Sequence, residues 1–385
     1  MVDALAWGLA ASIPAAARIL WDGALSSAWR RRPQNMHADN PEDKSASLIL
    51  CVHNDLDHLQ TIWPLWRGQV FPKDWTVQWV IVNDGSTDGT QQWLSQQLAK
   101  DINPSMIVLV NHQKSRPGKK EALTKGIEAA RYDRLVLTDA DCRPGPDWAF
   151  HMASSLGNTP KEPIVTLGFS LPIGGPRLLQ FDALRIAWQY GAAAARGHAY
   201  MGVGRNIAYR KHLWASLNGF QQHLNLSSGD DDLFVQSARQ SGHLIRTFTT
   251  QRTTMANPTV AVPDVLDGLK RKQRHLSTAK RYTPNILTHL ALDVGLDSLI
   301  VLSAFTGMLG LLHNQGWIPI VAAGVALLFR AVNLSSFAKD LGLPVNSGFR
   351  ATLLGPMRWG FLAVATLLNF TSSPTWTQRA PTSRS

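Results

Sequence analysis

The stretch VQWVIVNDGSTDGT, from Val77 to Thr90, decides the fold class of this chain. Its first six residues are mostly apolar and β-branched, which is typical of a strand buried on both faces of a parallel sheet. The residues from Asn83 onward are the Gly, Ser, Thr and Asp that favour turns and helix starts. A buried strand that leads through a polar loop into a helix is one unit of an α/β sheet.

The same pattern recurs on both sides of this unit. We predict further strands and helices at 47–52, 56–67, 90–98, 106–110, 121–130 and 135–138. Strands that alternate with helices predict an α/β fold with a doubly wound, mostly parallel sheet and flanking helices. Ligands bind such sheets at the carboxyl ends of the strands, where this sequence places its polar clusters.

The composition narrows the class of protein. The chain has 385 residues and a formal net charge of +11, and 45% of its residues are hydrophobic, which excludes a disordered chain. Its two cysteines exclude a disulfide scaffold and suit free thiols in a reducing compartment. Part of the basic excess lies at 30–32 and 270–281, beside apolar segments. That placement favours membrane lipids as the partner and argues against nucleic acid.

Three apolar runs of membrane-spanning length lie near the C-terminus, at 286–312, 317–334 and 351–370. Buried helices of a soluble domain are also apolar, but three tandem runs with short connections favour membrane helices. We therefore predict a membrane region over 284–370 with two or three transmembrane helices. Whether the third run crosses the membrane is left open, because Pro356 and Arg358 interrupt it.

Three ionisable residues share one helix face in the first of these runs. His289, Asp293 and Asp297 recur every four residues. Ionisable groups at membrane depth are candidates for function. The cleanest apolar stretch begins only at Leu296, which favours the alternative that this turn lies at the interface or packs under the globular domain.

The N-terminal segment 1–32 is apolar from Ala4 to Trp21, apart from Pro14 and Arg18. Its basic cluster at 30–32 follows the apolar stretch, whereas a signal peptide carries its positive charge first. An interfacial amphipathic helix or a weak membrane anchor, with the basic cluster on the cytoplasmic side, fits better. Residues 33–45 are then a linker, 46–283 a cytoplasmic globular domain and 371–385 a tail.

Asp84 follows the strand at 77–82 in a loop rich in Gly, Ser and Thr. A carboxylate at this edge can accept hydrogen bonds from a nucleotide base or ribose. The alternative is that the loop only caps the next helix through Ser86 or Asp88.

Asp139 and Asp141 follow the strand at 135–138. In an extended segment residues i and i+2 face the same side, and two adjacent carboxylates repel each other unless a cation lies between them. Because Mg²⁺ typically takes one or two carboxylates plus substrate phosphates, the pair predicts a divalent-metal site for a diphosphate. A solvated Asp-rich turn is the alternative.

Two more charged clusters are candidates for the same site. The loop after the third strand is basic and either faces a phosphate or is solvated; its members are Lys114, Arg116, Lys119 and Lys120. A run of three acids, 230–232, opens a predicted helix over 233–241. Acids are ordinary in a first helical turn, but three in a row repel one another and one of them can serve as a general base.

In this order the motifs resemble the family 2 glycosyltransferases with the GT-A fold, in the membrane-integrated branch. The resemblance covers about 46–283. The motifs that carry it are LILCVHN (48–54), VIVNDGSTDGT (80–90), GKKEAL (118–123), DAD (139–141), GVGRNIAYR (202–210) and GDDD (229–232).

The resemblance implies how a nucleotide-sugar donor is held. Asp84 would recognise the nucleotide, usually its uridine part, and Asp139 would contact the nucleotide-sugar. Asp141, together with Asp139, would coordinate Mg²⁺ or Mn²⁺ on the diphosphate. The further candidates for nucleotide-sugar binding are Asn54, Lys119 and Arg274.

The resemblance also implies a single displacement with inversion at the anomeric carbon. Asp230 would be the base that deprotonates the acceptor hydroxyl, with Asp231 as the second choice, because the triple Asp leaves the register open. The metal and the basic residues would stabilise the charge that develops on the leaving diphosphate.

One departure from the family concerns the acceptor. Processive members carry Gln-x-x-Arg-Trp near the membrane, whereas residues 271–275 here read RKQRH, so Arg274 is retained and His275 replaces the aromatic residue. This favours transfer of a single sugar to a lipid-linked or glycan acceptor at a bacterial-type inner membrane over polymerisation. The alternatives are a polyprenyl-phosphate sugar transferase and a catalytically inactive nucleotide-binding membrane scaffold.

Overall fold

The computed structural model describes residues 2–32, 43–101, 106–157, 162–173, 176–226, 228–247, 255–258, 265–311, 317–344, 347–353, 360 and 364. These residues form two compact units. The sheet unit holds the described residues within 43–173 and 197–258, and the helical unit holds those up to 32, within 176–196 and from 265 onward. Residues 176–196 therefore group with the terminal helices, although they lie inside the range 46–283 that we predicted as one domain.

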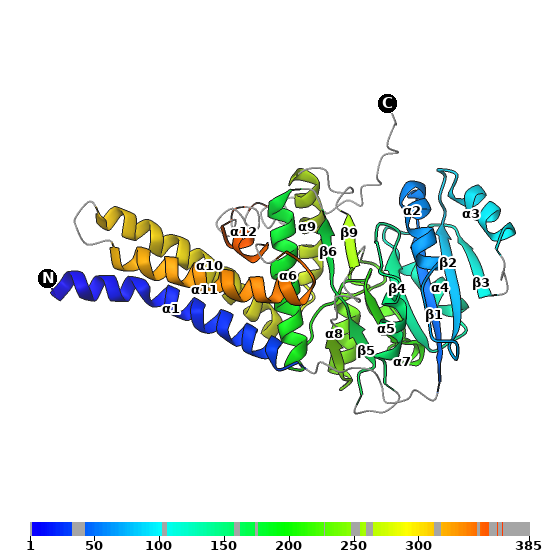
Figure 1. Cartoon of the computed structure of the whole chain (residues 1–385), viewed down its shortest axis with the longest axis horizontal. Helices are drawn as coiled ribbons and strands as arrows, with labels where there is room; N and C mark the ends of the chain where they lie inside the picture. Colours follow the sequence, from blue (N-terminus) through cyan, green and yellow to red (C-terminus); the bar gives the residue numbers. More distant parts are fainter. Residues whose placement is uncertain are drawn as a thin grey trace. The chain divides into compact units, whose positions relative to one another are not determined.

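A seven-stranded sheet forms the centre of the sheet unit, in the order β3-β2-β1-β4-β7-β5-β8 (Figure 1). Its strands are β1 (Ser45–Val52), β2 (Thr76–Asp84), β3 (Ile107–His112), β4 (Arg134–Asp139), β5 (Val165–Leu167), β7 (Ile207–Arg210) and β8 (Ile245–Thr247). The first four pair in parallel, β7 runs antiparallel between β4 and β5, and β8 is parallel to β5. The predicted mostly parallel sheet is confirmed. A separate parallel pair joins β6 (Ser170–Ile173) to β9 (Met255–Pro258).

The described helices of the sheet unit follow the strands in the predicted alternation. They are α2 (Leu56–Arg67), α3 (Thr90–Ala99), α4 (Lys120–Ala129), α5 (Trp148–Ser154), α7 (Lys211–Ser216), the short 3₁₀ helix η2 (Gln221–His223) and α8 (Asp232–Gln240). The predicted helices 56–67, 90–98 and 121–130 match α2, α3 and α4 to within one residue at each end.

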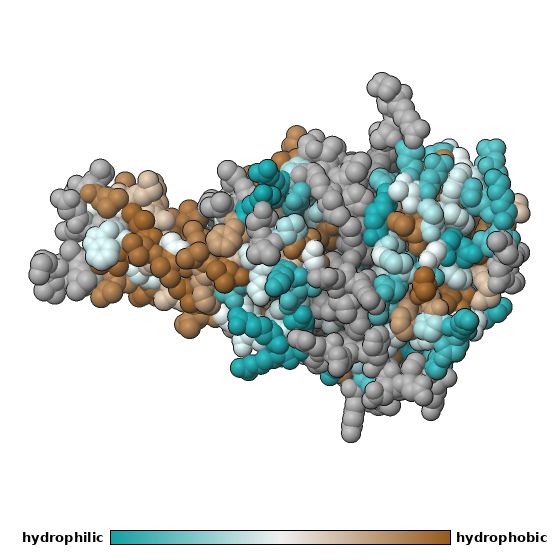
Figure 2. Space-filling model, viewed as in Figure 1, coloured by the Kyte–Doolittle hydropathy of each residue, from teal (hydrophilic) through white to brown (hydrophobic). Residues whose placement is uncertain are grey.

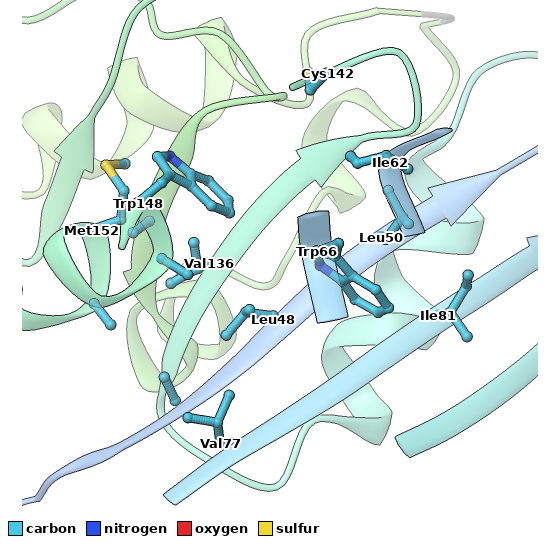
Figure 3. Packing of buried hydrophobic residues seen from close by; sticks show 14 of the residues in the cluster. Leu48, Leu50, Ile62, Trp66, Val77, Ile81, Val136, Cys142, Trp148 and Met152 are labelled. Carbon is cyan, nitrogen blue, oxygen red and sulfur yellow. The ribbon is translucent and has the colours of Figure 1, made fainter. Parts of the chain in front are cut away.

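The core of the sheet unit shows that helices cover both faces of the sheet. On one face Leu48 and Leu50 of β1 contact a cluster that includes Trp66 of α2 and Trp148 of α5 (Figure 3). On the other face α4 lies so close that a Cβ at Gly126 would come within 2.9 Å of the side chains of β1 and β2. Because both faces are covered, the middle of each of the strands β1, β2 and β4 is continuously apolar, at 48–50, 79–82 and 135–137.

The helical unit contains α1 (Val2–Arg30), α6 (Arg177–Ala195), α9 (Val265–Ala279), α10 (Pro284–Leu311), α11 (Trp317–Asp340) and α12 (Ser347–Leu353). Helices α1, α10 and α11 pack against one another, and hydrophobic residues cover much of their visible surface (Figures 1 and 2). Among the described residues, α10 and α11 are long and apolar enough to cross a membrane. Helix α10 contains residues 286–311 of the predicted run 286–312, and α11 contains the predicted run 317–334. The third run lies mostly outside the described residues, as do most of the linker 33–45 and the tail.

Candidate active site

The carboxyl ends of the parallel strands bring the predicted acidic residues to one edge of the sheet. Asp84 of β2 lies opposite His112 of β3 in the register of the two strands. Asp139 of β4 lies opposite Cys51 of β1. The register therefore places the ends of β1 to β4 side by side, as we expected for a ligand site in a doubly wound sheet.

Asp84 is almost completely buried, with 3% of its surface exposed. Its Oδ2 accepts a hydrogen bond of 2.5 Å from Nζ of Lys114, which also donates to the Gly118 carbonyl at 2.7 Å. Its Oδ1 has no hydrogen-bond partner among the described residues, and His112 Nε2 lies 3.7 Å from it. Buried carboxylate oxygens are normally satisfied, so Oδ1 is available to a donor from a ligand.

Two histidines beside Asp84 carry unsatisfied nitrogens as well. His53 Nδ1 lies 2.6 Å from the Asp84 carbonyl. A carbonyl oxygen only accepts, so this nitrogen donates and Nε2 of a neutral His53 is an acceptor. His53 Nε2 and His112 Nε2 are buried without a hydrogen-bond partner in the described part of the chain. The ends of β1, β2 and β3 thus hold three polar atoms that a planar, polar ligand can satisfy.

Asn54 and Asp88 hold the loop after β2 through hydrogen bonds to backbone N–H groups. Asn54, with a left-handed φ of 49°, uses its Oδ1 to accept a hydrogen bond from the Thr87 backbone N–H at 2.7 Å. Asp88 accepts from the backbone N–H groups of Leu56 and Thr90, at the starts of α2 and α3. Asp88 therefore supplies the capping that one reading of the sequence assigned to this loop, and Asp84 is left for another role.

Lys119 joins the end of β4 to the acidic run before α8. Its Nζ lies 2.9 Å from Asp139 Oδ1 and 3.2 Å from Asp230 Oδ2. Gly204 makes room for this contact, since a Cβ there would come within 3.0 Å of both Asp230 Oδ2 and Lys119 Nζ. Burial on its own lowers the pKa of Lys119, but the two carboxylates outweigh it and raise that pKa well above its usual value.

The structure separates the three consecutive acids. Asp231 is tied to the backbone, because its two carboxylate oxygens accept from the N–H groups of Gly204 and Asp232, both at 2.8 Å. Burial and the neighbouring Asp230 raise the pKa of Asp231. Burial also acts to raise the pKa of Asp230, but the Lys119 ammonium outweighs it and the pKa of Asp230 lies below its usual value. Asp232 is the first residue of α8.

Asp141 lies beyond the end of β4. The strand ends at Asp139 and a turn begins at Ala140, so the strand alternation on which we based the prediction does not reach Asp141. The Arg205 guanidinium donates from Nε to Ser170 Oγ at 3.0 Å. Burial on its own lowers the pKa of Arg205, but the negative charges around it, of which Asp141 has the largest effect, raise that pKa above its usual value. The sequence analysis did not single out Arg205, and its only signal was its place in the motif at 202–210.

The donor set suits a divalent cation that is shared with a substrate. No three His, Cys, Asp or Glu side chains come together as a complete metal site in the part of the chain that the structure describes. The chain offers the two carboxylates of Asp139 and Asp141, and phosphate and water oxygens would complete the coordination, which is how Mg²⁺ is commonly held.

The basic residues of the loop after β3 make different contacts. Lys114 and Lys119 contact Asp84 and Asp139 as described, whereas Arg116 lies 3.5 Å from Glu121 and is half exposed. Lys120 is buried and its Nζ donates to carbonyl oxygens of the segment before Asp230. These acceptors are the carbonyls of His223 (2.6 Å), Leu226 (3.0 Å) and Ser228 (2.6 Å).

We predict that Lys120→Met lowers the free energy of unfolding by about 2–3 kcal/mol, because three carbonyls lose a charged donor and the loop that positions Asp230 loosens. Thermal or denaturant unfolding of the purified chain measures this. The matched control is Lys125→Met on the same helix, where the side chain is half exposed and pairs with Glu128, so the change should stay within about 0.5 kcal/mol. Equal losses for the two variants would contradict the role given to Lys120.

The structure does not test the contact predicted for Arg274. This residue lies on α9 in the helical unit, and its side chain is outside the described part of the chain. Its proposed contact with a diphosphate therefore stays a prediction from the sequence.

Part of this chain is similar to known glycosyltransferases. Residues 47–212 match the family model described as glycosyl transferase family 2. EpsH of Bacillus subtilis, which is named as a glycosyltransferase, is 29% identical over 117 residues, 30% of this chain and 32% of EpsH. A poly-β-1,6-N-acetyl-D-glucosamine synthase of Staphylococcus aureus is 33% identical over 99 residues, 26% of this chain and 21% of the synthase. The chain thus matches less than a third of the length of these relatives.

A solved structure extends the likeness to nearly the whole chain. It is the mannosyltransferase PcManGT from Pyrobaculum calidifontis in complex with GDP-Man and Mn²⁺, with a TM-score of 0.55 and 18% sequence identity. The likeness covers 94% of this chain and 99% of that one. At this identity it supports the fold alone.

Proposed function

We propose a function from the premise that this chain is a family 2 glycosyltransferase with the GT-A fold, as the match over residues 47–212 indicates. The chain transfers one sugar from a nucleotide-diphosphate sugar to a hydroxyl of a lipid-linked or membrane-proximal acceptor. The reaction is a metal-assisted single displacement that inverts the anomeric carbon. The donor to test first is a UDP-sugar. The sheet unit is expected on the cytoplasmic side of a bacterial-type inner membrane.

One observation carries the proposal: the ammonium of Lys119 lies between Asp139 and Asp230. These two carboxylates come from opposite sides of the site, one from the end of β4 and one from the start of α8. A displacement needs charge stabilisation on the leaving-group side and a base on the acceptor side, with the reacting carbon between them. The contacts of Lys119 with both carboxylates support that arrangement.

The unsatisfied atoms at β1 to β3 support binding of the nucleotide base. Asp84 Oδ1 would accept the imide N–H of uracil, and the Asp84 carboxylate keeps its orientation through Lys114. Guanine also presents a ring N–H, so a GDP-sugar is the second donor to include. His53 and His112 supply the other polar atoms at this edge.

The diphosphate would lie near Asp139 and Asp141, where Arg205 and Lys119 provide positive charge. A divalent cation bound by the two carboxylates would neutralise the charge that develops on the leaving nucleoside diphosphate. Lys119 and Arg205 would bind the same phosphate oxygens directly, and a guanidinium is well suited to such a contact.

Binding of the donor would also prepare the base. Without a donor, Lys119 holds the pKa of Asp230 low, which makes Asp230 a weak base. A diphosphate that draws Lys119 away would raise the proton affinity of Asp230 as the acceptor arrives. Asp230 would then take the hydroxyl proton while the new glycosidic bond forms.

Two features support a single transfer near a membrane. Helices α10 and α11 have the length and apolar composition of membrane spans. His275 stands where processive family members carry a tryptophan, so the aromatic platform for a growing chain is replaced.

The proposal is tested by incubating the detergent-purified full chain with a panel of UDP- and GDP-sugars and Mn²⁺ or Mg²⁺, and measuring released nucleoside diphosphate. We expect release from one donor, loss of release with EDTA, and a decrease of about 100-fold or more in Asp141→Ala. Glu128→Ala, at a half-exposed acid paired with Lys125, is the matched control and should keep wild-type activity. Equal activity in Asp141→Ala and the control would contradict the proposal.

Replacing Asp84 by Asn tests the nucleotide position. Loss of the charged acceptor should weaken binding of the nucleoside diphosphate by about 10- to 100-fold, measured by calorimetry. The matched control is Asp88→Asn in the same loop, which should lower stability by about 1 kcal/mol, because an amide oxygen replaces only one of the two oxygens that accept from the Leu56 and Thr90 N–H groups, while the nucleotide affinity stays unchanged. Unchanged affinity in Asp84→Asn would exclude a contact between Asp84 and the base.

A further inference from the structure

A buried cluster of six charged residues lies inside the helical unit. Its members are Arg18 and Asp22 of α1, Arg185 of α6, Asp293 and Asp297 of α10, and Arg330 of α11. None of the six is more than 8% exposed. Three arginines face three aspartates, so the cluster has no net formal charge.

The ion pairs run between different helices. Arg185 Nη2 lies 2.6 Å and 2.7 Å from the two oxygens of Asp293, which Arg18 also contacts at 2.8 Å. Arg330 binds Asp22 at 3.0 Å and Asp297 at 2.5 Å. Two of the three residues that recur every four positions in the sequence, Asp293 and Asp297, are therefore partners of arginines on neighbouring helices.

Contacts along the bundle fix the directions of the three long helices. Gly8 of α1 lies against Ile318 near the start of α11, and Trp29 Nε1 donates to Asp340 at the end of α11. Ser303 of α10 donates to the Ala11 carbonyl. Helix α1 therefore runs parallel to α11 and antiparallel to α10. The start of α1 lies at the same end of the bundle as the end of α10 and the start of α11.

The outer surface of the bundle carries no charge over a long band. Within 6–24 of α1, 286–311 of α10 and 317–336 of α11, all the Asp, Glu, Lys and Arg residues belong to the buried cluster. The band is about 27 to 38 Å long at 1.5 Å per residue, close to the roughly 30 Å of a bilayer's hydrocarbon core. Large apolar side chains of all three helices are exposed along it, among them Leu9, Ile13 and Leu20 of α1, Phe305 and Met308 of α10 and Val325 of α11.

From these observations we propose that α1 is a third membrane-spanning helix, and that the neutral ion cluster is what allows its two charged residues to lie within the bilayer. Lipid covers this uncharged band of the bundle surface. Arg18 and Asp22 lower the hydropathy of α1, so composition alone marks only α10 and α11 as spans. Their charges never meet lipid, because each is paired inside the bundle.

Two further features support a spanning α1. Small residues line its contact with α11, where Ala15 packs with Ala323 and Ala326, and small residues let membrane helices approach closely. The basic residues Arg30 and Arg31 follow the band at the end of α1, and Lys339 follows it at the end of α11. Because basic residues favour the cytoplasmic side of a membrane, this end of the bundle faces the cytoplasm, and the start of α1 lies on the opposite side of the membrane.

Single cysteines at the two ends of α1 test this topology. Asp3→Cys and Arg31→Cys are made in the full chain, with Val2→Cys as a second probe at the start of the helix. Sealed vesicles are treated with a membrane-impermeant maleimide before and after detergent. Wild type, whose Cys142 is buried and Cys51 partly so, gives the background. Lys125→Cys, at a half-exposed site of the sheet unit, reports which vesicles present that unit outward.

In vesicles where Lys125→Cys reacts, we expect Arg31→Cys to react and Asp3→Cys to react at least 10-fold less until detergent is added. Labelling of Asp3→Cys and Val2→Cys within twofold of Arg31→Cys before detergent would overturn the proposal, since α1 would then lie on one side. Protection of both ends would overturn it as well. The result does not depend on transferase activity, so it stands apart from the proposed function.

Discussion

Asp230→Asn is expected to lower the rate of sugar transfer to a hydroxyl acceptor by about 10²- to 10⁴-fold, the usual contribution of a positioned general base. Among the three consecutive acids, Asp230 is the one whose carboxylate contacts the Lys119 ammonium, at 3.2 Å, rather than a backbone N–H group of α8. The amide keeps the shape of the side chain but cannot take the acceptor proton. The measurement is transfer at saturating donor, together with nucleoside diphosphate affinity, which should change little.

The matched control is Asp231→Asn. Its carboxylate is held by the backbone N–H groups of Gly204 and Asp232, so the variant should lose stability more than it loses catalytic rate. A phosphate acceptor needs no deprotonation near neutral pH. If Asp230→Asn keeps most of the wild-type rate, the hydroxyl acceptor is excluded, and a polyprenyl-phosphate sugar transferase becomes the better account.

Asp293→Asn is expected to lower the free energy of unfolding in detergent by about 3–5 kcal/mol, the usual result of breaking a buried ion pair by removing one partner. Asp293 is contacted by Arg185 and Arg18, and Trp21 Nε1 donates to it at 3.1 Å. Without the carboxylate the cluster holds one uncompensated positive charge with no access to water. Denaturant or thermal unfolding of the solubilised chain measures the loss.

The double variant Asp293→Asn with Arg185→Gln is the control, because it removes both members of one pair and restores the neutral cluster. It should be more stable than the single variant. If Asp293→Asn is as stable as wild type, charge balance does not hold the bundle together.

The sheet, and the positions of Asp84 and Asp139 at one edge of it, were predictable from the sequence because both depend on local patterns. The apolar runs that end at Asp84 and Asp139 mark β2 and β4, and the parallel alternation of strands and helices places their ends at one edge. The helices α2, α3 and α4 follow from the same alternation. Each of these inferences uses residues that lie close together in the sequence.

The contacts that join distant segments were not predictable in the same way. The sequence gives no signal that Lys119 meets both Asp139 and Asp230, or that Arg205 lies near Asp141, because those residues are far apart in the chain. Arg18 and Asp293, which form an ion pair, lie even farther apart in the sequence. Acids at 293 and 297 could be placed on one helix face, but their partners on α1, α6 and α11 depend on the packing of the bundle.

The most direct test of the central claim, a metal-assisted nucleotide-sugar site at the ends of β1 to β4, is calorimetric titration of the purified full chain with UDP and with GDP. Each titration is run with Mn²⁺ and with EDTA, in wild type and in Asp141→Ala. We predict that one of the two nucleotides binds in the presence of Mn²⁺, and that EDTA or Asp141→Ala abolishes the binding. Absence of binding by both nucleotides in wild type, or binding that neither EDTA nor Asp141→Ala changes, would contradict the account.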